Sequence, residues 1–208
     1  MNKKGFEMSI GLIVLIILSI VIFSLSLYFI FKWFGSAEEL KAEIDRQTSD
    51  QITAALKTGN QLVAIPVAVQ QAKRGKSASF GLGVRNIAAE KRFSMALDFS
   101  GAYYPDGKEI PADAMYMNEH WLGGFATADI GLLKRNEQRV VPFLIKADLN
   151  VAPGVPAPMG DYVFNVCVYD KPLTVAAEPP ARCSIGQFKI NSEAFYTSKI
   201  YQVTVKLV

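Results

Sequence analysis

The sequence has few of the residues on which catalytic and metal sites depend. Among its 208 residues there is one histidine, His120, which excludes a His-rich metal site. The adjacent Glu119 cannot share a ligand face with it, because neighbouring residues point to different faces of a helix or strand. A nucleophile needs an oriented base, and no Gly-x-Ser-x-Gly segment is present. We therefore expect no enzymatic activity, no metal and no cofactor.

Charge of one sign is not in excess either. The 22 lysines and arginines nearly balance the 19 aspartates and glutamates, which leaves a net charge of +3. This balance does not single out nucleic acid as a partner, and we expect none. The basic run of residues 73–76 is typical of a solvated turn. Asp106, Asp113 and Asp129 lack the order of an EF-type calcium loop.

Cysteine is scarce, and both copies lie late in the chain. Cys167 falls within a predicted strand, and Cys183 follows the proline-containing loop of residues 170–182. A disulfide between them would clamp this loop to the next strand and would require an oxidising compartment. The alternative is a pair of free, buried thiols. The uncharged run of residues 8–31, which predicts that the rest of the chain lies outside the cell, favours the disulfide.

What the sequence does contain is a long uncharged run near its beginning. Residues 8–31 are 24 consecutive residues without a charge. As a helix they would extend about 36 Å, enough to cross a bilayer core of about 30 Å. Lys3 and Lys4 precede the run, so the positive-inside bias favours a cytoplasmic N-terminus. The run predicts a transmembrane helix that contacts the membrane through residues 8–33, and an extracellular domain after it.

An amphipathic pattern continues beyond the run. No proline or glycine interrupts residues 37–57, which carry a stripe at helical intervals formed by Leu40, Ile44, Thr48, Ile52, Ala55 and Leu56. The pattern predicts a helix that continues the membrane segment and ends at Gly59. Its stripe must pack on the following domain, on a neighbouring subunit, or on both.

From residue 61 the periodicity changes to that of strands. Short, turn-separated strands are predicted over residues 62–69, 77–86, 93–99, 139–149, 162–169, 186–190 and 200–208. Pro66 places the first of them at an edge or a bulge. The stretch of residues 111–128 is irregular. The number of strands and the absence of helical patterns between most of them indicate an antiparallel sandwich.

Two of these strands resemble segments of immunoglobulin-like domains. Residues 158–166 contain a Gly-x-Tyr-x-Phe pattern that opens a late core strand in many such domains, and residues 79–86 resemble an early strand that ends in Val-x-Asn. The resemblance covers residues 62–208. It implies an immunoglobulin-like β-sandwich for those residues. With the helix predicted before them, the expected fold class is α+β, a long N-terminal hydrophobic and amphipathic α-helix followed by an antiparallel immunoglobulin-like β-sandwich. The expected segments are a leader-like segment (1–5), a transmembrane or filament-core helix (6–33), an amphipathic extension (34–60) and the sandwich domain (61–208).

The first residues resemble the leader of archaeal type IV pilin-like proteins. In that family a membrane peptidase cuts after the glycine of a basic leader, and the mature subunits bundle their hydrophobic helices into a filament core. The resemblance implies processing by a prepilin-type peptidase at Lys3, Lys4, Gly5 and Phe6. Ile10 stands where bacterial members place a glutamate. Glu7, the second residue of the processed chain, is the candidate assembly contact. Its partner would be the N-terminal amine of a neighbouring subunit or Lys4 of an uncut chain, and the alternative is that its side chain extends to interfacial water.

Aromatic residues concentrate in the irregular middle of the domain, at Tyr103, Tyr104, Tyr116, Trp121 and Phe125. If they are exposed, they would form an adhesive or subunit-packing patch. If they are buried, they fill the core.

The function predicted from these features is that of a structural subunit. The chain would assemble with copies of itself into a type IV pilus-like surface filament, with the helix in the core and the sandwich exposed for adhesion or as surface structure. The alternative is an uncleaved single-pass surface protein, anchored in the cell membrane, whose sandwich binds a ligand or partner. A secreted protein cut after Ala37 is disfavoured, because the apolar run exceeds the usual length of a signal-peptide core.

Overall fold

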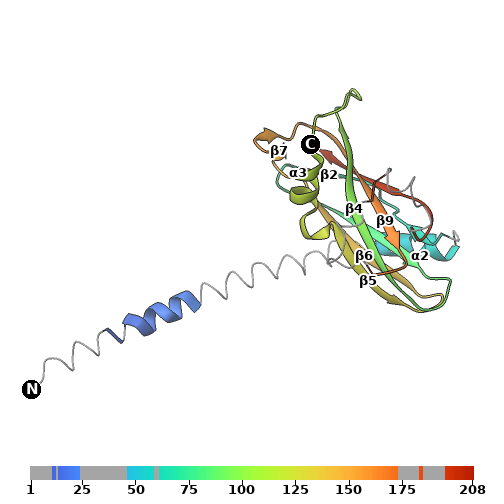
Figure 1. The fold of residues 1–208 in the computed structure, drawn as a ribbon, viewed down its shortest axis with the longest axis horizontal. Coiled ribbons are helices and arrows are strands. Elements are labelled where there is room, and N and C mark those ends of the chain that lie inside the picture. Colours follow the sequence, from blue (N-terminus) through green and yellow to red (C-terminus); the bar gives the residue numbers. More distant parts are fainter. Residues whose placement is uncertain (1–10, 13, 24–45, 59–60, 173–182, 185–194) are drawn as a thin grey trace, which may run out of the picture. The chain divides into compact units, whose positions relative to one another are not determined.

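The computed structural model describes residues 11–12, 14–23, 46–58, 61–172, 183–184 and 195–208 (Figure 1). The chain divides into two compact units, Met1–Glu43 and Ile44–Val208.

In the first unit, residues 11–12 and 14–23 are helical. No helix in the described part of the chain combines the length and the apolar character that crossing a bilayer requires. The prediction of a transmembrane helix over residues 6–33, continued to residue 60 as one long helix, is therefore wrong for the described residues. It rests on an uncharged run that extends well beyond the described helical residues.

The second unit is built mainly from strands. A three-stranded sheet has the order β1-β3-β6, and its strands are Val63–Ala64, Ser77–Arg85 and Gln138–Lys146. A five-stranded sheet has the order β2-β10-β9-β4-β5, formed by Val69–Ala72, Tyr201–Leu207, Gly160–Tyr169, Lys91–Tyr103 and Thr127–Leu133. A separate small hairpin pairs β7 with β8, Asn150–Ala152 with Val155–Pro156.

Three short helical segments connect β4 to β5. They are the α-helix α3 (Ala114–Met117), the π-helical η1 (Asn118–Leu122) and the 3-10 segment η2 (Gly123–Phe125). The carboxylate of Asp113 caps α3 by accepting from the amides of Met115 and Tyr116 at 2.9 and 3.0 Å. The irregular composition of this stretch therefore corresponds to a compact helical connection.

The larger sheet is mixed, which corrects the predicted fold class. Strand β2 runs parallel to β10, whereas the other neighbours in the sheet are antiparallel. Of the strand predicted over residues 62–69, the structure shows a strand only at β1, which joins the small sheet, and at Val69, the first residue of β2. The rest of β2, residues 70–72, was expected to be a turn, and instead it joins the large sheet. Strand β4 also changes register at Phe93/Ser94 and at Phe99/Gly101. The prediction of an α+β protein with a purely antiparallel immunoglobulin-like sandwich is thus wrong, because alternation reveals a strand but neither its direction nor its sheet.

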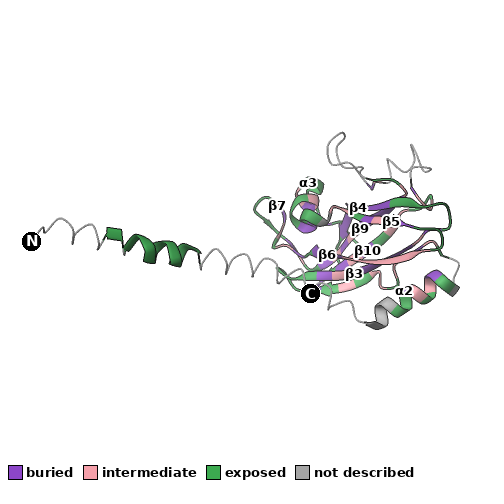
Figure 2. Cartoon of the chain, turned by 90° about the horizontal axis from the view of Figure 1, so that it is seen from below, coloured by how far each residue is buried: buried purple, intermediate pink, exposed green. Residues whose placement is uncertain are grey.

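The main core lies between the two sheets (purple in Figure 2). Phe80 of β3 stacks on Phe143 of β6, with ring centroids 5.4 Å apart, and both side chains are buried. Tyr162 and Phe164 enter from β9. Trp121 of η1 lies 4.5 Å from the ring of Tyr162 and donates its indole hydrogen to the carbonyl of residue 150 at 2.8 Å. The connection between β4 and β5 therefore contributes a large side chain to this core.

Helix α2 (Arg46–Thr58) packs on the small sheet (Figure 2). Its Ile52 and Leu56 are completely buried, and they contact the backbone at Gly83, where any β-carbon would collide with both side chains. Arg85 donates from its guanidinium to the carbonyl of Leu56 at 3.1 Å, near the C-terminus of the helix. The predicted amphipathic stripe is thus covered by the strands that follow it, in the part of the helix that the structure describes.

Candidate functional site

The apolar segment of residues 11–23 is the first candidate site. Ten large apolar side chains of its described residues are each 48–66% exposed: Leu12, Val14, Leu15, Ile16, Ile17, Leu18, Ile20, Val21, Ile22 and Phe23. The hydroxyl of Ser19 donates to the carbonyl of Leu15 at 2.8 Å, so its hydrogen is used within the helix.

The exposed side chains of this segment lie on every side of the helix. Successive residues are about 100° apart around a helix axis, so five consecutive residues already encircle it. Residues 14–18 are such a run, and all five are valine, leucine or isoleucine. A helix that is apolar all round is stable only when it is surrounded by other apolar groups.

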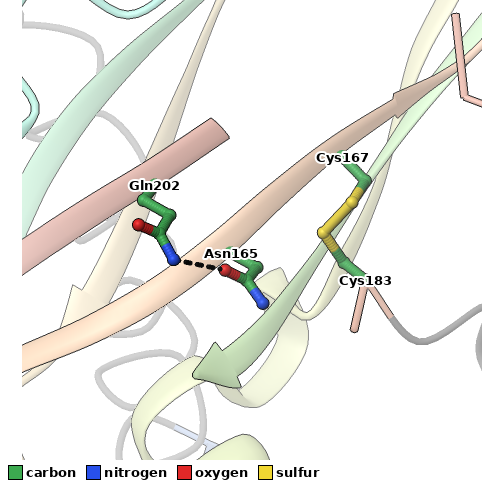
Figure 3. The surroundings of a disulfide bond; sticks show 4 residues. All are labelled: Asn165, Cys167, Cys183 and Gln202. Atoms are coloured by element: carbon green, nitrogen blue, oxygen red, sulfur yellow. Dashed lines mark hydrogen bonds between the residues drawn. A yellow bond between two sulfur atoms is a disulfide. The ribbon is translucent and has the colours of Figure 1, made fainter. Parts of the chain in front are cut away.

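The second candidate site lies on the face of the large sheet that points away from the main core. Cys167 of β9 and Cys183 form a disulfide with Cα atoms 5.6 Å apart, and both residues are completely buried (Figure 3). Around it, Ala96, Tyr169 and Phe195 complete a small apolar cluster. Burial raises the pKa of the Tyr169 hydroxyl to about 12, and the charge of Asp98 adds to this shift.

A row of polar side chains crosses three strands beside the disulfide. Asp98 of β4 is paired with Asn165 of β9, and Asn165 with Gln202 of β10. Gln202 donates from its amide to Asn165 Oδ1 at 3.1 Å (Figure 3). Asn118 donates to Asp98 and accepts from the amide of Phe99 at 2.7 Å. These hydrogen bonds give partners to polar groups that are buried in the domain. The row consists of one carboxylate and three amides, and it contains no nucleophile paired with a base.

Sequence reasoning missed this polar row. The signal that could have found it is the pair Asp98 and Asn165, each a polar residue beside apolar neighbours within a strand pattern. That signal becomes useful only once the register places those positions side by side.

The structure separates the five aromatic residues that the sequence grouped together. Trp121 is buried in the core, whereas Tyr103 and Tyr104 are 42% and 37% exposed. Tyr116 is half-buried and stacks on His120, with ring centroids 4.0 Å apart. The side chain of Phe125 lies outside the described part of the structure. The four that are described therefore do not form one exposed patch.

The remaining predicted site residues have the following outcomes. Lys3, Lys4, Gly5, Phe6 and Glu7 lie outside the described residues. Among the residues that are described, no group of three or more histidine, cysteine, aspartate or glutamate side chains could hold a metal ion. The three aspartates considered for calcium have other contacts: Asp106 pairs with Lys108, Asp113 caps α3, and Asp129 pairs with Arg92.

Comparison with known proteins assigns no family. No family model matches the chain, and no curated protein matches it. A family 123 glycoside hydrolase from Clostridium perfringens is 11% identical, with a TM-score of 0.36 over 76% of this chain and 25% of that chain. The class 5 fimbriae chaperone CfaA is 13% identical, with a TM-score of 0.30 over 69% of this chain and 55% of that chain. The chain thus spans between a quarter and about half of these structures, and the type IV pilin-like and immunoglobulin-like descriptions have no support among the matches.

Proposed function

We propose that this protein is a structural subunit that assembles with copies of itself into a surface filament. The apolar segment of residues 11–23 supplies the assembly contact, and the β unit, Ile44–Val208, is displayed outside the assembled helices. The single observation that carries the proposal is the exposure of ten large apolar side chains on this short segment.

Copies of the same segment are the occupant that best suits these side chains. A groove on another protein would cover one side of the helix, whereas a bundle of identical helices covers all sides at once. Full burial of each leucine, isoleucine or phenylalanine side chain stabilises the assembly by about 1.5–3 kcal/mol. Ten such side chains per copy are sufficient to offset the entropy lost when subunits associate.

The disulfide supports a location outside the reducing cytosol. Cys167 and Cys183 are joined and buried, and bonds of this kind form and persist in oxidising compartments. The proposal therefore places the β unit at the cell surface or in another oxidising space.

The test is assembly of the full chain in buffer without detergent, measured by sedimentation and electron microscopy. The wild-type chain should sediment as elongated particles. Ile17→Glu, which introduces a charge at a side chain that is 56% exposed, should remain dispersed. The matched control is Leu132→Glu on β5, where the side chain is 54% exposed, and this variant should assemble normally.

Two results would contradict the proposal. One is a wild-type chain that stays dispersed at every concentration tested. The other is a chain that sediments only with phospholipid vesicles and loses this association in Ile17→Glu, because lipid would then be what covers the segment.

A further inference from the structure

A pocket of about 510 Å³ lies between the segment that leads into β1 and the turn that precedes β10. Residues 61–63 line one side, and residues 196–199 with Tyr201 line the other. The volume is within the range of sites that hold small molecules. The pocket belongs to the β unit, and neither of the candidate sites described above includes it.

The two sides of the pocket are joined through the backbone of Arg85. Its amide donates to the carbonyl of Leu62 at 2.8 Å, and its carbonyl accepts from the hydroxyl of Tyr196 at 2.7 Å. The ring of Tyr196 also packs edge-on against Phe93, with centroids 4.8 Å apart. The amide of Tyr196 donates to the carbonyl of Val168 at 2.8 Å. This side of the pocket is therefore fixed before any ligand arrives, which lowers the entropic cost of binding.

Several uncharged polar groups line the pocket. The hydroxyls of Thr197 and Tyr201 lie 3.1 Å apart and share one hydrogen bond, so one hydroxyl hydrogen of the pair remains for a ligand. Gln61 adds an amide that can both donate and accept. Ser198 has a φ of 48°, a conformation that residues other than glycine rarely adopt and that recurs where ligands are held.

Among the lining residues that the structure describes, Lys199 is the one charged side chain and none is an acid. Lys199 is exposed, and it forms no ion pair with the acids that the structure describes. A cation with no acidic partner among the described residues favours an anionic ligand, whereas the hydroxyls and the amide favour a ligand with several hydroxyl groups. Leu62 and the ring of Tyr196 supply apolar surface for carbon atoms.

We propose that this pocket binds a carboxylated sugar. Lys199 receives the carboxylate, the pair formed by Thr197 and Tyr201 bonds to sugar hydroxyls, and the ring of Tyr196 contacts the C–H groups of the sugar. The inference goes beyond the proposed filament and does not depend on it.

The test is calorimetric titration of the full chain with glucuronate, and with glucose as the neutral control. Glucuronate should bind about tenfold more tightly than glucose, since a charge-assisted hydrogen bond adds to the shared contacts. Lys199→Ala should remove this preference. The matched control is Lys206→Ala, which changes an exposed lysine of β10 outside the pocket. This variant should retain the preference for glucuronate.

A second variant separates the hydroxyl contacts from the charge. Tyr201→Phe should lower the affinity for both sugars by a similar factor and leave the preference for glucuronate unchanged. Absence of binding by the correctly folded wild-type chain, or a preference that survives in Lys199→Ala, would overturn the proposal.

Discussion

Two helical regions of this chain differ in how far their apolar side chains are buried. In α2, Ile52 and Leu56 are completely buried on the small sheet, whereas the ten described large side chains of residues 11–23 are about half exposed or more. The difference follows from how the apolar residues are distributed. In α2 they form a stripe that one sheet can cover, and in the first unit they encircle the helix.

The comparison shows that apolar composition alone does not identify what covers a helix. A stripe at helical spacing is complementary to a flat apolar surface, and the domain that follows α2 supplies one at Gly83. An apolar circumference needs neighbours on all sides, which a single sheet does not provide. This is the physical reason why we place the assembly contact in residues 11–23 and not in α2.

The largest expected effect comes from truncating a buried leucine of α2, and an exposed leucine of the first unit serves as the comparison. Leu56→Ala should lower the free energy of unfolding of the β unit by about 2–5 kcal/mol, because it leaves a cavity against the small sheet. Leu18→Ala, at a side chain that is 58% exposed, should leave that free energy unchanged. Both are measured by denaturant unfolding of chains dispersed in a mild detergent. Equal losses in the two variants would show that the first unit is covered by the β unit.

A smaller loss of stability is expected when the disulfide is removed. Cys167 and Cys183 are separated by 16 positions, and closing a loop of this length stabilises a domain by about 3 kcal/mol. Cys167→Ala with Cys183→Ala should therefore lower the unfolding midpoint of the β unit, and reduction of the wild-type chain should have a similar effect. Assembly through residues 11–23 should persist in the double variant. Its loss would mean that the two regions are not independent.

Much of the strand content could be predicted from the sequence, because it depends on local alternation. The strand expected over residues 77–86 corresponds to β3, and that over residues 162–169 to β9. Strand β5, at residues 127–133, was missed because it begins inside the stretch interpreted as irregular and contains Gly131, whose φ is 95°. The prediction for residues 186–190 lies outside the described part of the chain.

Sheet membership and the candidate sites could not be predicted in the same way. The assignment of β1 and β2 to different sheets and the parallel pairing of β2 with β10 depend on contacts between distant parts of the sequence, such as Val69 with Thr204. The pocket depends on the same kind of contact, because Arg85 joins Leu62 to Tyr196. Local patterns carry no information about such pairings.

The smallest expected loss of stability comes from breaking an exposed ion pair at the edge of the large sheet. The pair is formed by Arg92 of β4 and Asp129 of β5. The hydrogen bond from Arg92 holds the pKa of the Asp129 carboxyl below its usual value. A carboxyl with a depressed pKa in the folded state contributes stability above its unfolded pKa of about 3.9, and this contribution is lost as the pH falls through the folded value.

Asp129→Asn should therefore be slightly less stable than the wild type at pH 7, by a small margin because both side chains are about half exposed. The difference should shrink as the pH falls below about 4. Thermal unfolding at a series of pH values measures it, with Glu90→Gln as the control, because Glu90 is exposed and forms no ion pair among the residues that the structure describes. A difference that grows at low pH would show that the pair does not stabilise the edge. The large loss expected at Leu56 and the small one expected here would together show that, in this unit, buried apolar contacts outweigh surface charge.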